Sequence, residues 1–245
     1  QSKFLLIPAS FTLDAYRYIF STPTFFQSMR VSLFITIVGT VFKMLITFMF
    51  AYALAHRDLP GRTFMNYAII FTMVFSAGMI PNFLAVIGYG LRDSLWALIV
   101  PGLIDSFNLV IIRSFIQNIP GELEESAKLD GCNEVHILFA IIMPLSMASI
   151  ATFSLFYAVG LWNTYMSALL YIPDNAKWPI QVLLRQIVYV SSSIGDDSEI
   201  TSEVALLSQS IKMAVILVAT VPIVCVYPFL QKHFTKGILV GAVKG

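Results

Sequence analysis

The charged side chains best placed for chemistry lie in the stretch EESAKLDGCNEVHILFAIIMPL, residues 124–145. Glu124 and Glu125 open this stretch, Glu122 lies just before it, and a long apolar run follows. Carboxylates in the first turn of a helix complement the positive end of its dipole, each by about 0.3–1 kcal/mol. A solvated, capped loop explains such a segment when acidity is its only feature. Here the small residues, the glycine and the closing proline also follow the glutamates in a specific order and spacing, which indicates a more specific role than that of a capped loop.

Other kinds of site find little support in the residue pattern. Cys132 and Cys225 are far apart, and His56, His136 and His233 are scattered, whereas a metal site needs clustered ligands. We therefore interpret both cysteines as small apolar residues and predict no metal site. The chain also lacks the Gly-x4-Gly-Lys-Ser/Thr phosphate loop, so we expect it to bind no ATP and no other cofactor.

Two short helices are expected to position the acidic residues. Pro120 and Gly121 disfavour continuation of the preceding helix, which predicts a new helix from about residue 121 to 129. Asp130 and Gly131 then form a turn, with Gly131 suited to the left-handed conformation that ends helices. A second helix would begin near Cys132 and enter the following apolar run near Pro144.

Composition places these helices in an integral membrane protein. The chain has 245 residues, of which 58% are hydrophobic and 12% charged, and its mean hydropathy is +0.81. A soluble domain of this size cannot hide so much apolar surface in one core. The formal net charge is only +1, which argues against a nucleic-acid partner.

The predicted fold class is all-α, with five transmembrane helices inside a domain at residues 28–232. The long uncharged runs place the spans at about 28–55, 64–87, 95–117, 141–163 and 209–231. Residues 1–27 form a lead-in segment, residues 164–208 a loop that includes an amphipathic helix near 178–190, and residues 233–245 a tail. Gly78 and Pro81 predict a bend in the second span. Lys and Arg are equally numerous on the two sides, so the positive-inside rule assigns no orientation.

The spacing of the acidic segment resembles a known signature. The order Glu-Ser-Ala, Gly, Ile-x-Met-Pro closely resembles the "EAA…G…I-x-LP" signature of permease subunits of binding-protein-dependent ABC importers. "FTLDAYRYIF", "AYALAHRDLPGR", "WN" and "FTKGILVGAVKG" are also similar to the carbohydrate-uptake branch, and the C-terminal part is similar to the subgroup that serves oligosaccharides and uronate polymers, alginate importers included. The residues that the resemblance assigns to ATPase coupling are Glu124, Glu125, Ser126, Ala127, Gly131, Ile141 and Pro144. Ser126 and Met143 depart mildly from the signature.

The resemblance also implies an assembly and an orientation. It implies two ATPase subunits that bind ATP and Mg, a second homologous permease and an extracytoplasmic solute-binding protein. Residues 121–140 would be cytoplasmic coupling helices, and the lead-in segment and the 164–208 loop would be extracytoplasmic. Six spans are usual in this branch, so a further span is expected before residue 1. The protein would then be no enzyme, but a multi-pass permease of a bacterial cytoplasmic membrane that imports an oligosaccharide, with alginate or a similar uronate favoured over maltose-like or aldouronate sugars.

A sugar path needs hydrogen-bonding groups and aromatic faces at membrane depth. The candidates are Asn82, Trp96, Asp105, Asn108, Tyr157, Trp162 and Asn163, although packing explains each of them as well. Asp105 and Asn108 are three apart, which places them on one helix face and favours a joint role. Lys43 lies within a span and is expected to be paired in the interior, with Asp105 as one possible partner. Trp178 and Arg185 are possible contacts for the binding protein.

Two other classes of protein fit the composition. A passive channel or ion-coupled carrier would need no ATPase, and a membrane anchor or sensor subunit would need no transport path. Neither class requires the Glu125 to Pro144 spacing, which is why the importer hypothesis is preferred.

Overall fold

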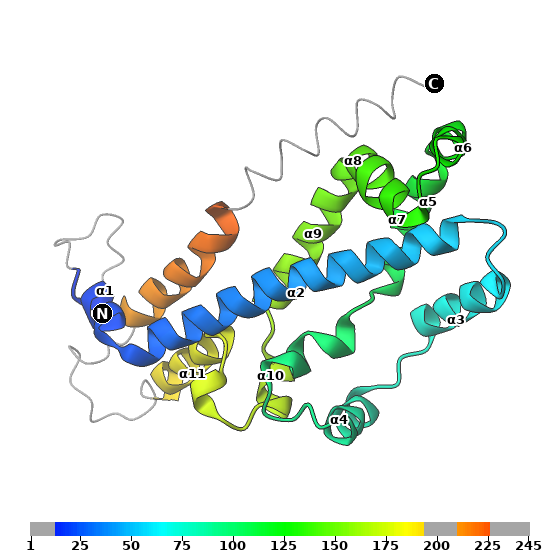
Figure 1. Ribbon diagram of the computed structural model, residues 1–245. Coiled ribbons are helices and arrows are strands. Elements are labelled where there is room, and N and C mark those ends of the chain that lie inside the picture. The colour runs from blue at the N-terminus through cyan, green and yellow to red at the C-terminus, as the bar shows by residue number, and fades with distance from the viewer. Residues whose placement is uncertain (1–12, 194–209, 226–245) are drawn as a thin grey trace.

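The computed structural model describes residues 13–193 and 210–225, and this part of the chain contains helices and no strands (Figure 1). The fold is therefore all-α, as the sequence predicts. In chain order, the α-helices are α1 (Asp14–Ser21), α2 (Pro23–Ala55), α3 (Arg62–Val74), α4 (Met79–Gly88), α5 (Ser106–Gln117), α6 (Glu122–Leu129), α7 (Glu134–Ile137), α8 (Met143–Leu145), α9 (Met147–Trp162), α10 (Met166–Tyr171) and α11 (Ile180–Ser193). A further apolar helix spans Ser210–Cys225.

Helix α2 is the long axis of the molecule (Figure 1). Its 33 residues begin with Pro23, whose fixed φ suits a first helical turn, and continue without a helix breaker to Ala55. The chain then turns at His56–Gly61, where Gly61 adopts a φ of 76°. Helices α9, α5 and α11 pack along α2.

The second long apolar run does not form one helix. Helix α3 ends at Val74, Phe75 is extended, and Gly78 adopts a φ of 84° before α4 begins. A bend in this run is the sequence prediction, and Gly78 is the residue that permits it. Many large side chains on α3 and α4 are exposed, among them Phe64, Phe71 and Ile80.

Two further segments are bent rather than straight. Residues Leu95–Leu98 (η1) and Val100–Gly102 (η2) are short 3₁₀ helices, and together they make an angle of 54° with α5. Glu134–Leu145 meets Met147–Trp162 at 84°, and between α7 and α8 the residues Leu138–Ile142 (η3) are π-helical. Within the described residues, α2 is long and apolar enough to cross a membrane by itself, and up to three spans result if each bent pair counts as one.

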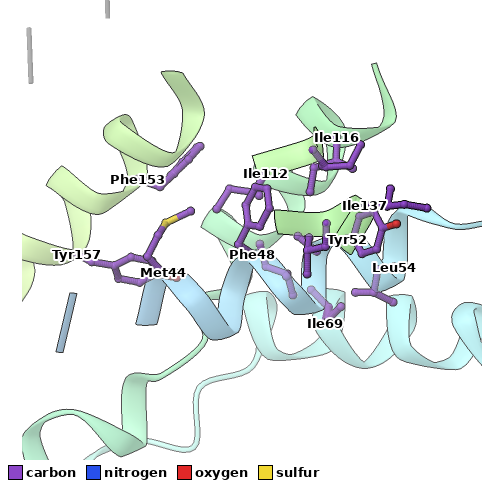
Figure 2. Close-up of a cluster of buried hydrophobic side chains, with 14 of the residues drawn as sticks. Met44, Phe48, Tyr52, Leu54, Ile69, Ile112, Ile116, Ile137, Phe153 and Tyr157 are labelled. Carbon is purple, nitrogen blue, oxygen red and sulfur yellow. The ribbon is translucent and has the colours of Figure 1, made fainter. Parts of the chain in front are cut away.

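A buried cluster joins one end of α2 to its neighbours. Figure 2 shows Met44, Phe48 and Tyr52 of α2 facing Ile112 and Ile116 of α5, Ile137 of α7, and Phe153 and Tyr157 of α9. Phe48, Ile112 and Ile137 are fully buried. Because several helices share these contacts, α7 is attached to the Ala55 end of α2 rather than held only by its chain connections.

A second cluster lies near the other end of α2. Ile180 and Leu184 of α11 pack there with Trp162 and with Val215 of the helix Ser210–Cys225. The amphipathic helix predicted near residues 178–190 is thus present as α11, longer at its C-terminal end than expected, and its apolar face is used for packing within the molecule.

Candidate functional site

The acidic segment, residues 121–145, lies at the Ala55 end of α2 (Figure 1). Its first helix, α6, carries Glu122, Glu124 and Glu125 in its first turn, as the sequence predicts. The helix ends at Leu129, and Gly131, two residues later, has a φ of 82°. The N–H of Cys132 donates to the carbonyl of Ala127, and the N–H of Gly131 to that of Lys128, both at 3.0 Å. These two bonds form a Schellman motif, which ends α6 and turns the chain.

The second helix of the acidic segment starts later than expected. Asn133 caps α7 by accepting the N–H of His136 at 2.8 Å, so the helix begins at Glu134 rather than Cys132. It continues through the π-helical turn, which contains the partly buried Ile141, to Pro144 in α8. The helical direction changes only at Ser146, two residues after Pro144.

Three polar contacts tie the acidic segment together and to α2. The Tyr52 hydroxyl donates to Oε2 of Glu134 at 2.9 Å, and Nε2 of His56 lies 3.1 Å from Oε2 of Glu124. Nζ of Lys128 lies 2.8 Å from Oε1 of Glu134. Sequence reasoning missed Tyr52, His56, Lys128 and Glu134, because their partners are distant in the chain or on the next helix.

The ion pair between Lys128 and Glu134 connects α6 to α7. The hydrogen bond from Lys128 is the main cause that lowers the pKa of the Glu134 carboxyl below its ordinary value of 4.5. The same hydrogen bond raises the pKa of Lys128 above 10.5. Both groups are therefore charged at neutral pH, and the pair links the two short helices.

The outer surface of the acidic segment combines carboxylates with unpartnered apolar side chains. Glu125 and Ser126 are exposed, while Ala127 is buried against the cluster of Figure 2. Leu129 is 89% exposed and Val135 is 63% exposed. Exposed apolar side chains beside charges are typical of a protein-binding surface. Leu129 and Val135 are absent from the sequence-based candidates, although the apolar residues between charged neighbours could have indicated them.

A basic cleft of 680 Å³ adjoins this surface. Arg57, Arg62 and Arg113 line it, with His56 and Glu124 at its edge. Arg62 donates to the carbonyl of Leu54 at 3.0 Å, and Arg113 donates to Asn66. Arg62 thereby links the start of α3 to the end of α2, and Arg113 links α5 to α3.

A second cleft, of 450 Å³, lies halfway along α2. It brings together four of the predicted sugar-path residues, Asn82, Asp105, Asn108 and Tyr157, with Lys43. The cleft is formed where the 3₁₀ segment Leu95–Gly102 gives way to α5, so its floor is irregular backbone and its walls are α2, α4, α9 and α10. We call this cavity the polar cleft.

Tyr157 holds the polar cleft together. Its hydroxyl lies 2.8 Å from the hydroxyl of Thr47 and accepts the backbone N–H of Asp105 at 3.3 Å. One side chain of α9 is thereby bonded to α2 and to the start of α5. Tyr157 is buried, so both bonds are shielded from water. They fix the position at which the 3₁₀ segment gives way to α5.

The arrangement of Asp105 differs from the expectation. Asp105 precedes α5, and its Oδ1 accepts the N–H of Asn108 at 2.8 Å. It is a helix cap, so the two residues do not share a helix face, because the helix does not include Asp105. The expected ion pair with Lys43 is also not formed within the described residues. Lys43 instead lies over the Tyr157 ring, with Nζ 5.8 Å from the ring centroid.

Three sugar-path candidates lie outside the polar cleft. Trp162 is buried in the cluster around α11 and donates to the carbonyl of Ala219 at 3.2 Å. Asn163 is exposed and bonds to the carbonyl of Val159 at 2.8 Å. Trp96 packs edge-on against Phe42. Trp162 and Trp96 thus fit the packing alternative, whereas Asn163 is exposed and its bond to Val159 is local to the end of α9.

The predicted contacts in the 164–208 loop are used within the molecule. Trp178 donates to the carbonyl of Ile172 at 2.8 Å, and the Arg185 guanidinium lies 4.5 Å from the centroid of the Tyr165 ring. Across the parts of the chain that the structure describes, no group of three His, Cys, Asp or Glu side chains could hold a metal ion.

Comparison with known proteins gives consistent results. The family description "Binding-protein-dependent transport system inner membrane component" matches residues 16–240. A Bacillus subtilis (strain 168) protein named polygalacturonan/rhamnogalacturonan transport system permease protein YtcP is 59% identical over 246 residues, covering 100% of this chain and 86% of the relative. Protein LplC of the same organism is 54% identical over 245 residues, covering 100% of this chain and 83% of the relative.

A solved structure is also similar over almost all of the chain. It is described as the crystal structure of a bacterial ABC transporter involved in the import of the acidic polysaccharide alginate. The TM-score is 0.85 at 29% identity, with 96% of this chain and 84% of that chain covered.

Proposed function

Because the chain belongs to the family of binding-protein-dependent transport system inner membrane components, we propose that it is the permease subunit of an ATP-driven importer of uronate-containing oligosaccharides. It is a transport component and not an enzyme. Hydrolysis of ATP with Mg belongs, in this proposal, to two partner ATPase subunits, and the sugar is delivered by an extracytoplasmic solute-binding protein.

The observation that carries the substrate proposal is the 59% identity, over the whole chain, with a relative named for polygalacturonan and rhamnogalacturonan transport. The solved structure is named for another acidic polysaccharide, alginate, but is only 29% identical. Galacturonate and the sugars of alginate share a carboxylate on a sugar ring. Galacturonate oligosaccharides are therefore favoured over alginate oligosaccharides, and uronates over neutral sugars. A 30% identical relative from Halalkalibacterium halodurans is named for arabinooligosaccharides, which makes a neutral oligosaccharide the second candidate.

The acidic segment is the proposed docking element for an ATPase subunit. Glu125, Ser126, Leu129 and Val135 present charge and apolar surface outward, while Ala127 and Ile137 anchor the segment on α2, α5 and α9. Of the residues expected to take part in coupling, Glu124 and Ile141 face neighbouring parts of the molecule. We assign these two a positioning role and assign contact with the ATPase to the exposed residues.

The proposed setting is a cytoplasmic membrane, crossed several times, with a second homologous permease beside this chain. The exposed apolar side chains of α3 and α4 support contact with lipid or with that second permease. The polar cleft is the part of the described structure best suited to a sugar, because Asn82, Asn108 and Tyr157 line it with hydrogen-bonding groups.

The test uses the complete importer, purified with both permeases, the ATPase subunits and the binding protein in lipid vesicles. Trigalacturonate, an alginate trisaccharide and maltotriose are each loaded on the binding protein, and ATP hydrolysis and sugar uptake are measured. We expect trigalacturonate to give the largest stimulation of both. Stimulation by maltotriose alone would refute the uronate assignment, and uptake without ATP would refute the importer assignment.

A further inference from the structure

We propose that Lys43 binds the carboxylate of the transported sugar, so that the polar cleft selects acidic over neutral sugars. This inference rests on the proposed function, and it assigns the selection to one side chain. None of the sugar-path candidates from the sequence carries a positive charge, and among the described residues that line the polar cleft Lys43 is the one cation.

The position of Lys43 is unusual for a lysine that only packs. It lies in the middle of α2, far from either helix end, where a lysine cannot easily reach water at a membrane surface. A charged side chain at that depth is costly unless it has a partner or serves a ligand. Within the described residues, the ammonium has no ion pair and no hydrogen bond, and its close neighbour is the face of the Tyr157 ring.

The surroundings direct the ammonium into the cleft. Gly102, on the 3₁₀ segment, has no side chain, and Nζ of Lys43 lies 3.0 Å from the place that a Cβ would occupy there. The Tyr157 ring lies on another side. Tyr157 is held in turn by Thr47 and by the backbone of Asp105. The ammonium is thus supported on two sides by rigid groups and retains N–H donors for a ligand.

Asp105 is the anion in the cleft that would compete with a ligand carboxylate. It attracts Lys43 electrostatically but forms no ion pair with it in the described structure. Its Oδ1 instead accepts the N–H of Asn108 at the start of α5, where the positive end of the helix dipole offsets part of its charge. Lys43 therefore remains available, and its half-buried ammonium binds a carboxylate more strongly than it would in water.

Size and chemistry agree with a sugar acid. The cleft volume of 450 Å³ falls within the range of about 300–1,000 Å³ that is usual for small-molecule sites. Asn82, Asn108 and Tyr157 can bond to sugar hydroxyls, while Lys43 offers the one charge that a neutral sugar would not use.

The test compares Lys43→Met with Lys43→Arg in the complete importer. Uptake is measured for trigalacturonate and for its methyl ester with all three carboxylates esterified, which has the same rings but no charge. Rates are expressed per sugar-loaded binding protein, so that selection by the binding protein is removed. Arg30→Met is the matched control, because Arg30 is an exposed cation on the same helix and does not line the polar cleft.

We expect Lys43→Met to lower trigalacturonate uptake by about tenfold or more, since a hydrogen-bonded charge is lost. Lys43→Arg and Arg30→Met should remain within about threefold of the wild type, a change of under 1 kcal/mol. Uptake of the methyl ester should be equal in the wild type and Lys43→Met. An equal loss for both sugars would overturn the proposal by showing that Lys43 only supports the fold, and no loss for either would show that it does not meet the sugar.

Equilibrium dialysis of trigalacturonate against the purified permease and ATPase complex, without binding protein, gives a second measurement. Weaker binding to the Lys43→Met complex supports the proposal, and unchanged binding contradicts it. Failure of the wild-type importer to take up any uronate would instead refute the proposed function. Uptake of trigalacturonate that is equal in wild type and Lys43→Met would refute this inference and leave the proposed function intact.

Discussion

Gly131 is the residue whose conformation most directly shapes the acidic segment. It ends α6 with a φ of 82°, and a Cβ built there would meet no atom within 4 Å. The requirement for glycine is therefore one of backbone conformation and not of space. An L-residue in this left-handed conformation costs roughly 1–2 kcal/mol, and Asn less than most.

Gly131→Ala is accordingly expected to lower the thermal stability of the segment and the amount of ATPase that copurifies, while Gly131→Asn stays closer to the wild type. Melting temperature in detergent and quantitative pull-down of the ATPase subunits measure the two effects. Equal loss in both variants would mean that the left-handed turn is not what the ATPase requires.

Glu134 and Lys128 make a pH-dependent contribution to the stability of the folded protein, also at the scale of single residues. The lowered pKa of Glu134 gives stability that is present above its ordinary value of 4.5 and is lost as the pH falls through the lowered value of the folded protein. The raised pKa of Lys128 gives stability that is present below 10.5 and is lost as the pH rises through the raised value. Both side chains are partly solvent-exposed, so the pair contributes at most about 1 kcal/mol.

Glu134→Gln keeps an acceptor for the Tyr52 hydroxyl but removes the charge. We expect it to melt slightly below the wild type at pH 7 and to match the wild type once Glu134 is protonated in acid. Melting curves across that pH range check this, and a constant difference at all pH values would disprove an electrostatic origin.

At the scale of elements, Asp105 sets where α5 begins. Its side chain accepts the N–H of Asn108 at 2.8 Å, a cap that Asn provides about as well as Asp and Ala does not. We expect Asp105→Ala to cost about 1 kcal/mol and to perturb the polar cleft, and Asp105→Asn to retain the helix start. Melting temperatures of the two variants separate them. A large loss in Asp105→Asn would show that the charge, and not the cap, is needed.

Helix α7 anchors the acidic segment in the buried cluster through Ile137. Ile137 is fully buried among α2, α5 and α9, while Val135 on the same helix is 63% exposed. Ile137→Ala should lower stability by about 2–5 kcal/mol, because it leaves a cavity. Val135→Ala should change stability by less than about 0.5 kcal/mol. Unfolding monitored by intrinsic fluorescence measures the loss of stability in each variant. Similar losses in Ile137→Ala and Val135→Ala would mean that α7 is not anchored by this core.

At the scale of the whole molecule, α2 connects the two regions of proposed function. Lys43 borders the polar cleft, and Tyr52, nine residues further along the same helix, bonds to Glu134. An uninterrupted helix rises about 1.5 Å per residue, so the two points are about 13 Å apart on one rigid rod. A movement of the acidic segment would reach the polar cleft without passing through a loop.

A break in α2 between Lys43 and Tyr52 should uncouple the polar cleft from the acidic segment. Met49 lies between them and is 43% exposed, so Met49→Pro kinks the helix with little loss of core, whereas Met49→Ala preserves it. We expect Met49→Pro to retain basal ATP hydrolysis in the complex but to lose its stimulation by sugar-loaded binding protein. Stimulation that survives in the proline variant would show that coupling does not run along α2.

The sequence by itself determined the features that depend on local chemistry. The apolar runs required an all-α membrane protein, Gly78 placed a break, and the acidic residues with Gly131 defined a capped helix and its turn. Backbone preferences and hydrophobic length act within a few residues, so a single chain reveals them. The spacing from Glu125 to Pro144 likewise carried the resemblance to importer permeases, and the family match agrees with it.

Only the tertiary structure decided which distant side chains meet. The Tyr52 to Glu134 bond joins residues 82 positions apart, and nothing in the local pattern of either residue specifies the other. The same holds for the polar cleft, which gathers Asn82, Asn108 and Tyr157 around Lys43 but leaves Trp162 in a packed core. Which polar residue lines a cleft and which is buried depends on how the helices pack, and packing is a property of the whole chain.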